Sequence, residues 1–306
     1  MKLKIIQNRK YSYIFSGILT LMSILSLIAW GLKPGLDFTG GSLLEIKFNI
    51  ARPASVEISG SLSSLNLGEL RVQPAGASDV ILRFKDVDEE THQKIMAAFK
   101  EKFPASDSQS SFIENRFESV GPIIGQELQN KAWIAVVLAS LAIIFYIAYA
   151  FRKVSRPVAS WKFGVAAVVA LIHDVLIVSG LFSILGHFAG IEVDAMFITA
   201  LLTILGFSVH DTIVVFDRIR ENLARHYSAD FEEVANDSIN QTITRSINTS
   251  LTILLVLVAL YLFGGATIAN FALALIAGIF IGTYSSIFVA SPIVVDWYYL
   301  SKKLRK

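Results

Sequence analysis

Long stretches without charged residues alternate with charged segments along the chain. The first four stretches free of Lys, Arg, Asp and Glu, apart from Asp174 in the third and Asp211 in the fourth, cover residues 11–32, 132–151, 163–191 and 195–216. A helix needs roughly 20 apolar residues to cross a bilayer, so each stretch predicts one membrane span. The first span has no small-residue cleavage site after it, which favours an uncleaved helix over a signal peptide.

A longer uncharged stretch covers residues 246–295. It is too long for a single membrane span, and Gly264-Gly265 near its middle is a turn signal. We therefore divide it into two spans at about 246–263 and 269–295. The hydropathy pattern thus predicts six spans.

Basic residues flank these spans in four groups. They precede the first span, fill the loop after the second, follow the fourth and end the chain: Lys2, Lys4, Arg9, Lys10; Arg152, Lys153, Arg156, Lys162; Arg218, Arg220, Arg225; Lys302, Lys303, Arg305, Lys306. Lys and Arg collect in cytoplasmic loops of membrane proteins. With six spans all four groups fall on one side, which predicts that both termini are cytoplasmic.

The only long polar segment, residues 33–131, is then expected outside the membrane on the opposite side. Its pattern predicts strand, helix, strand, strand, helix, strand at about 42–48, 53–65, 70–72, 80–84, 88–103 and 112–120, with Asp88 as the N-cap of the second helix. That order is typical of the ferredoxin-like α+β fold. The predicted organisation is residues 1–32 with the first span, 33–131 as the external domain, and 132–306 with the remaining spans.

Composition narrows the function. The chain is 54% hydrophobic but only 17% charged, against about 25% charged for a soluble domain. A net charge of +2 offers no basic surface for nucleic acid. The absence of cysteine excludes disulfides, thiol nucleophiles and thiolate metal sites, and we expect neither a metal nor a cofactor.

Enzyme motifs are also missing. The sequence has no His-Glu-x-x-His and no Walker loop. Ser208, His210 and Asp211 crowd into one helical turn, a poor geometry for a nucleophile and its base. Asp174 and Asp211 could form an aspartyl pair only if they lay at equal depth, and their places in the spans differ.

The charged residues inside the spans are the candidate functional site, because ionisable groups are costly in a bilayer. Asp211 lies roughly 10 Å inside the cytoplasmic end of its helix at 1.5 Å per residue. Arg245 starts the fifth span at a similar depth. We expect the two to pair, so that a proton reaching Asp211 releases Arg245. The alternatives are a structural ion pair, or an Arg245 that extends to the headgroups.

Other polar residues are open to two interpretations. Arg245, Asn248, Thr249 and Thr252 form a polar stripe that should face protein or water rather than lipid. His173 and Asp174, near mid-membrane, fit either a proton relay or a hydrogen-bonded pair that fixes helix packing. His210 lies about 100° around the helix from Asp211 and should not share its partner.

Several motifs together resemble the SecF branch of the SecD/SecF family, within the resistance–nodulation–division superfamily. They include Asp37, Phe38, Gly40 and Gly41, where the glycines permit a tight turn into the external domain. The resemblance extends over the whole chain through residues 35–41 (GLDFTGG), 121–125 (GPIIG), 173–175 (HDV), 211–222 (DTIVVFDRIREN), Arg245 and 261–265 (YLFGG). His210 is a departure, since asparagine is expected there.

The resemblance implies a non-enzymatic subunit of the bacterial inner membrane that uses the proton motive force to assist protein export. It implies SecD, the SecYEG translocon and YajC as partners, and exported preprotein as the substrate. Asp211 would carry the proton and Arg245 would be its partner. A proton-driven small-molecule or lipid exporter and a structural membrane scaffold are the alternatives.

Overall fold

A computed structural model of the protein describes residues 3–49, 52–75, 77–104, 111–150, 160–225 and 230–304. The chain divides into two compact units: Pro34–Ala132, and Met1–Lys33 together with Trp133–Lys306. In the described ranges, six helices are long and apolar enough to cross a membrane, which confirms the predicted number of spans. Part of the evidence for orientation lies outside the described residues, namely Lys2, Arg152, Lys153, Arg156, Arg305 and Lys306.

The smaller unit carries a four-stranded antiparallel sheet with the strand order β2-β3-β1-β4. Its elements are α2 (Leu36–Thr39), β1 (Gly41–Phe48), α3 (Ser55–Ser61), β2 (Arg71–Ala75), β3 (Asp79–Phe84), α4 (Glu89–Lys102) and β4 (Phe112–Val120). Both helical connections skip one strand, so the predicted ferredoxin-like order is confirmed. Apolar side chains of β1, α4 and β4, among them Phe48, Phe99 and Phe112, form its buried core.

Two local predictions in this unit need correction. The helix after Pro53 begins only at Ser55 and ends at Ser61, because Ala54 is extended and serves as its N-cap. Pro74, predicted in a turn, lies within β2, an edge strand where a missing N–H is tolerated. The predicted cap is confirmed: the Asp88 carboxylate accepts a hydrogen bond from the Thr91 N–H at 3.0 Å, which lowers the pKa of Asp88.

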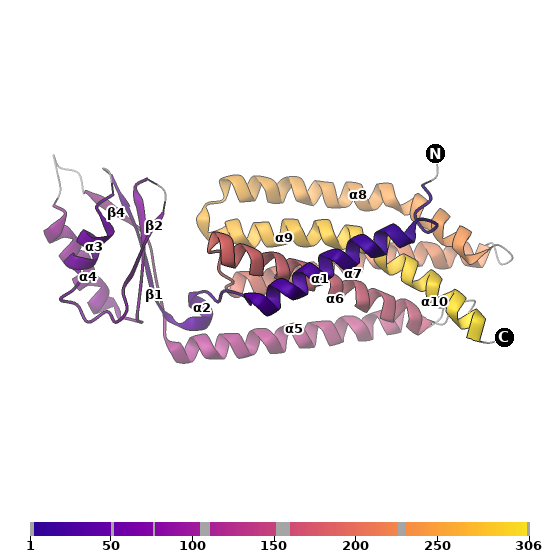
Figure 1. Ribbon diagram of the computed structural model, residues 1–306, viewed down its shortest axis with the longest axis horizontal. Helices are drawn as coiled ribbons and strands as arrows, with labels where there is room; N and C mark the ends of the chain where they lie inside the picture. The colour runs from indigo at the N-terminus through magenta and orange to yellow at the C-terminus, as the bar shows by residue number, and fades with distance from the viewer. Residues whose placement is uncertain are drawn as a thin grey trace. The chain divides into compact units, whose positions relative to one another are not determined.

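The larger unit is a bundle of long helices (Figure 1). They are α1 (Arg9–Ala29), α5 (Pro122–Ala150, whose first residues belong to the smaller unit), α6 (Ser160–Ala189), α7 (Ala195–Arg225), α8 (Phe231–Phe263), α9 (Ala266–Ser285), the π-helix η1 (Ser286–Ala290) and α10 (Ser291–Leu304). The predicted turn at Gly264-Gly265 separates α8 from α9, and Gly265 has a positive φ of 80°.

Helices α7 and α8 extend much further than their predicted spans. The Asn222 side chain donates to Ser238 Oγ at 2.9 Å, and Arg218 Nε donates to Gln241 Oε1 at 2.5 Å. These polar contacts join the two helices beyond the apolar stretches. The charge-based boundaries therefore do not mark the helix ends.

Both termini lie at one end of the bundle (Figure 1), here called the terminal end. The Arg9 guanidinium pairs with Asp296 of α10 at 2.7 Å and with Glu232 of α8 at 3.2 Å. Asn236 Oδ1 accepts hydrogen bonds from the N–H groups of Ile5 and Ile6. These bonds attach the start of the chain to α8 and α10.

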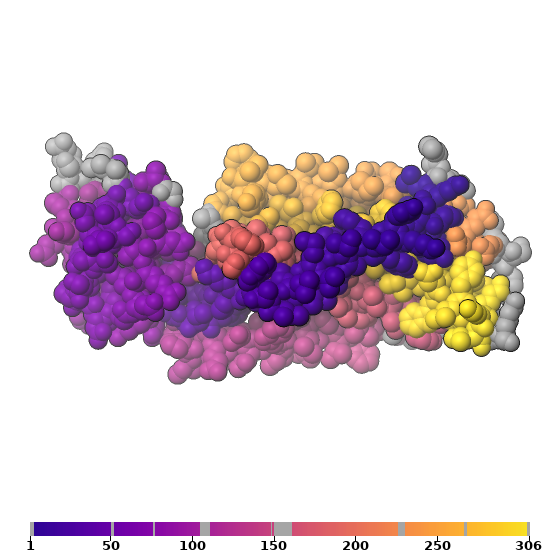
Figure 2. Space-filling view, in the orientation of Figure 1, coloured from indigo at the N-terminus to yellow at the C-terminus, as the bar shows by residue number. Residues whose placement is uncertain are grey.

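Helix α1 crosses one face of the bundle (Figure 2) and packs tightly on α6. A side chain at Gly180 would overlap Ser23, so glycine is required for this approach. The Ser26 hydroxyl donates to the Gly180 carbonyl at 3.1 Å, and the Ser183 hydroxyl donates to the Ser26 carbonyl at 2.9 Å. Small residues of this kind let membrane helices pack with backbones in contact.

Two of the family-like motifs meet inside the smaller unit. Gly40 has a φ of 70°, and a Cβ there would lie 2.8 Å from the Pro122 Cα. A Cβ at Gly125 would lie 3.1 Å from the Gly40 N and 3.2 Å from the Phe38 O. The motif at 35–41 therefore packs against the first turn of α5, and the predicted tight turn at Gly40-Gly41 is confirmed.

This contact makes a prediction with a matched control of opposite sign. Gly40→Ala should lower the free energy of unfolding by more than about 1 kcal/mol, because it adds both a clash and a strained φ. Gly60→Ala in α3, where no atom lies within 4 Å, should raise it by roughly 0.5–1 kcal/mol. Hydrogen–deuterium exchange of the β1 and β4 amides in the full-length protein measures both. Equal effects would contradict the packing.

Candidate functional site

Helices α7 and α9 pack closely along a row of small residues. Gly278, Gly282 and Ser286 recur every four residues on one face of α9 and η1. A side chain at Gly278 would overlap Ile204, and a Cβ at Gly282 would lie 3.1 Å from the Ser208 Cβ. This approach brings short hydroxyl side chains within reach of the neighbouring helix in the middle of the bundle.

Asp174 of α6 is completely buried at this junction. Its Oδ2 accepts hydrogen bonds from Ser208 Oγ of α7 at 2.6 Å and from Ser285 Oγ of α9 at 2.8 Å. Its Oδ1 lies 2.9 Å from the Nδ1 of His173. Both carboxylate oxygens thus have partners, and the one side chain joins three helices.

Asp211, one turn beyond Ser208 on α7, is 6% exposed and less completely bonded. Its Oδ1 accepts a hydrogen bond from Ser246 Oγ of α8 at 2.6 Å. Its Oδ2 is buried without a hydrogen-bond partner among the described residues. An ionised carboxylate in this position is poorly compensated, so the site favours a change of protonation or a further partner.

A π-helix follows directly on the serine that bonds to Asp174. Within η1, the Ser286 hydroxyl lies 2.8 Å from Thr212 Oγ1 of α7, and the preceding Ser285 donates to Asp174. The Ser291 hydroxyl donates to the Ser286 carbonyl, five residues back, at 2.9 Å. Single turns of π-helix are often found at functional sites. Here the turn lets two consecutive serines bond to two different helices.

The expected contact between Asp211 and Arg245 is replaced by one to the next residue. Ser246 faces α7, whereas Arg245 lies about 100° around α8 and is exposed on this chain. No ion pair joins Asp211 and Arg245, both of which lie in the described ranges. The guanidinium still acts on Asp211 electrostatically, as does His210.

The polar stripe of α8 points away from the chain's own helices. Arg245, Asn248, Thr249 and Thr252 are all exposed, as is His210 on α7. The inward face of the same part of α8 carries Ser246 and Ser250 instead. Because lipid satisfies no polar group, this outward stripe requires water or a second protein.

The structure also bears on the enzyme-like arrangements. Ser208 donates to Asp174, while His210 is exposed on another face of α7, so these residues form no nucleophile–base pair. Asp174 and Asp211 bind different serines and form no dyad. Within the described ranges no three His, Asp or Glu side chains are grouped to hold a metal ion.

Sequence reasoning missed the hydroxyl groups that organise the site. They are Ser208, Thr212, Ser246, Ser250, Thr283, Ser285 and Ser286. A usable signal was present, because Ser246 and Ser250, and Gly278, Gly282 and Ser286, recur at four-residue spacing on one helix face. Serine is common in membrane helices, however, so the sequence did not identify any single serine as part of the site.

The network around Asp174 makes a stability prediction. Ser208→Ala and Ser285→Ala should each lower the free energy of unfolding by about 1–3 kcal/mol, because each removes a hydrogen bond to a buried charged group. Ser140→Ala is the control, since that hydroxyl bonds only the Val136 carbonyl of its own helix. Unfolding of the purified protein in mixed micelles measures the difference. An effect of Ser140→Ala as large as the others would refute the assignment.

The sequence of this chain is similar to those of known proteins. Residues 99–300 match the family described as protein export membrane protein SecD/SecF, C-terminal, and residues 26–49 match the SecD/SecF GG motif. The protein translocase subunit SecF of Thermobaculum terrenum is 43% identical over 96% of this chain and 93% of its own length. SecF of Anaerolinea thermophila is 43% identical over 93% of this chain and 92% of its own.

Solved structures give the same result. The crystal structure of SecDF from Thermus thermophilus, described as a translocon-associated membrane protein, matches with a TM-score of 0.79 and 32% identity over 97% of this chain. SecDF in its super-membrane-facing form matches with a TM-score of 0.69 and 34% identity. The present chain spans 39% and 40% of the lengths of those two chains.

Proposed function

The chain belongs to the SecD/SecF family of protein export membrane proteins and is a multi-pass translocase subunit, and we propose that it couples proton movement at Asp211 to protein export. The observation that carries the proposal is the Asp211 carboxylate, buried between α7 and α8 with one oxygen bonded to Ser246 and the other without a partner. A proton bound to Asp211 would neutralise the charge of this carboxylate.

Arg245 is the second member of the proposed element. Opposite charges on Asp211 and Arg245 attract each other, and protonation of Asp211 removes that attraction. The guanidinium then reorients along the polar stripe of α8. Since α8 is joined to α7 through Ser246, a change at the carboxylate reaches the relative position of two helices, which is the kind of two-state element that coupling requires.

The polar stripe supports SecD as the partner that completes the site. SecDF, a longer chain, matches this fold, and Arg245, Asn248 and Thr249 are exposed here on a membrane-spanning helix. A protein surface carrying polar or acidic groups would satisfy them where lipid cannot. The site is thus proposed to be shared between the two proteins.

Because the chain belongs to the SecD/SecF family, we extend the proposal to its location and its partners. The membrane is the bacterial inner membrane, and the terminal end, with its basic residues, is cytoplasmic. The unit Pro34–Ala132 is then external and handles preprotein emerging from SecYEG, with YajC as a further associated protein. No reaction chemistry is assigned to the chain.

His173 and Asp174 are proposed as positioning residues and not as a proton relay. Both oxygens of Asp174 already have hydrogen-bonding partners on α6, α7 and α9, which favours a group that keeps one state and fixes Ser208. His210 is exposed on α7 and is proposed to serve as a hydrogen-bonding group toward the partner.

Asp211→Asn tests the coupling. The amide oxygen still accepts from Ser246 but the group carries no exchangeable carboxyl proton, so proton-dependent export should be lost while the complex with SecD still forms. Pulse-labelled preprotein maturation, with and without a protonophore, measures it. Asp217→Asn is the control, since Asp217 is exposed and paired with Arg220 at 3.0 Å, and it should leave export unchanged.

Normal export in Asp211→Asn would overturn the proposal. The scaffold alternative makes a different prediction, because a scaffold requires only that the helices pack. The double variant Asp211→Leu and Arg245→Leu would then still support export. We expect that double variant to assemble without supporting export. Normal export in the double variant would favour the scaffold.

The partner surface is tested by cross-linking. The chain has no cysteine, so single cysteines can be introduced without background. Asn248→Cys on the stripe should cross-link to cysteines placed in the membrane helices of SecD. Phe145→Cys on α5 should not cross-link to SecD. The native Phe145 side chain is 71% exposed, so a cysteine there is accessible. Cross-linking from Phe145→Cys alone would place the partner on the wrong face.

A further inference from the structure

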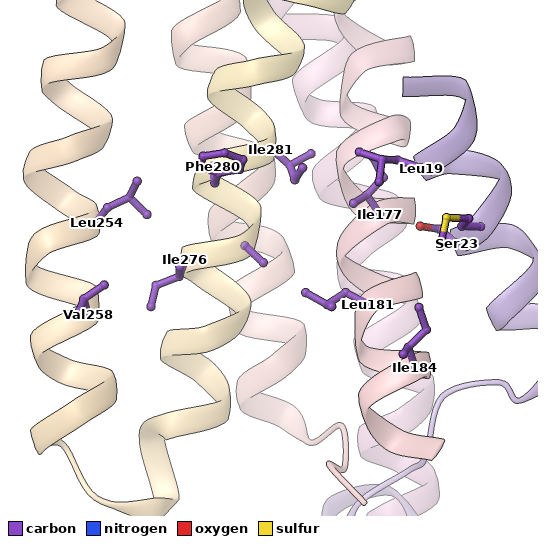
Figure 3. A pocket seen from close by; sticks show the side chains of 12 residues that line it. Leu19, Ser23, Ile177, Leu181, Ile184, Leu254, Val258, Ile276, Phe280 and Ile281 are labelled. Atoms are coloured by element: carbon purple, nitrogen blue, oxygen red, sulfur yellow. The ribbon is translucent and has the colours of Figure 1, made fainter. Parts of the chain in front are cut away.

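An apolar groove lies between α1 and α8 in the half of the bundle away from the terminal end (Figure 3). Its volume is about 530 Å³, and its walls include Leu19 of α1, Leu254 of α8 and Ile276 of α9. Ser23 is the only lining residue with a polar side chain. Phe280 at its rim is 64% exposed, so the groove opens sideways from the bundle.

The groove is closed toward the terminal end. There the Tyr284 hydroxyl donates to the Ser12 carbonyl at 3.2 Å and lies 3.2 Å from Ser16 Oγ. The Tyr284 ring also packs edge-on against Phe15, at 5.5 Å between centroids. Leu19, one turn further along α1, lines the groove.

The walls are held apart by fixed contacts. Ser23 is pressed against Gly180 of α6, and Ser26 and Ser183 add hydrogen bonds between the same two helices. Helix α1 therefore cannot move toward α9 without breaking its packing on α6. The groove is a preformed feature, and left empty it would forfeit dispersion contacts along every wall.

The shape and lining of the groove suit a hydrocarbon chain. The groove extends along α6 from Ile177 to Ile184, roughly 10 Å at 1.5 Å per residue. Its lining is apolar apart from Ser23. A single flexible hydrocarbon chain can lie along such a groove and make dispersion contacts with its walls.

The open end carries groups suited to the membrane surface. Trp30, seven residues after Ser23 on α1, stacks on His187 of α6 with ring centroids 4.7 Å apart. His187 follows Ile184 by three residues, so the pair continues the same helix faces beyond the groove. Tryptophan is enriched at the headgroup level of bilayers.

We propose that this groove binds one acyl chain of a bilayer phospholipid, with the headgroup beside Trp30 and His187 and the chain end near Tyr284. The bound chain fills the space between α1 and α8 and so becomes part of the packing of the bundle. The site is separate from Asp211 and holds whether or not proton coupling is correct.

The test uses the full chain in complex with SecD, in vesicles of phosphatidylethanolamine and phosphatidylglycerol. The probe is phosphatidylethanolamine with a diazirine in one acyl chain, and labelled peptides are mapped after illumination. We expect labelling concentrated on residues 19–23 and 276–281. Ala277→Phe, which fills the groove, should abolish that labelling, whereas Ala142→Phe on the exposed face of α5 should not.

Two results would overturn the proposal. Labelling no denser in the groove than at the exposed Leu138 of α5, and unaffected by Ala277→Phe, would mean bulk lipid only. Cross-links from groove residues to SecD would mean that a protein covers it. If Ala277→Phe prevents assembly with SecD, Leu254→Trp narrows the groove from the opposite wall and must give the same loss of labelling.

Discussion

Hydrocarbon provides no hydrogen-bond partner, and this constraint organises the membrane unit. Each polar side chain within the spans must be satisfied by another part of the chain, by water or by a second protein. Asp174 represents the first solution, with donors from α6, α7 and α9 around one buried carboxylate. Arg245 and Asn248 are exposed on this chain and so need water or a second protein.

Satisfying Asp174 internally requires an unusually close approach of helices. Short serine side chains reach the neighbouring helix only because Gly278 and Gly282 remove the bulk between α7 and α9. The π-helix at 286–290 adds a second adjustment, because it directs Ser285 to Asp174 and Ser286 to Thr212. The glycine spacing and the π-helix therefore act together, because both bring hydroxyl groups to their hydrogen-bond partners.

The sequence allowed the spans and the sheet order to be predicted, because both follow from local patterns. It placed Asp211 in the membrane and predicted a direct contact with Arg245, whereas the structure has Ser246 bonded to Asp211. The choice between the two residues depends on the rotation of α8 about its axis. That rotation is set by packing on α7 and α9, to which many residues contribute weakly. The hydroxyl network was missed for the same reason: a serine in a span gains meaning only from the helix opposite it.

The two buried carboxylates differ in how completely they are hydrogen-bonded. Asp174 lies at the centre of the bundle with both oxygens bonded, so a change of protonation there would break contacts on three helices at once. Asp211 lies next to the outward polar stripe with one oxygen unbonded, so its protonation costs few contacts and alters the field at Arg245. Under the proposed function Asp211 changes state repeatedly, and such a group is better placed at this edge, where a partner protein would supply the neighbouring surface.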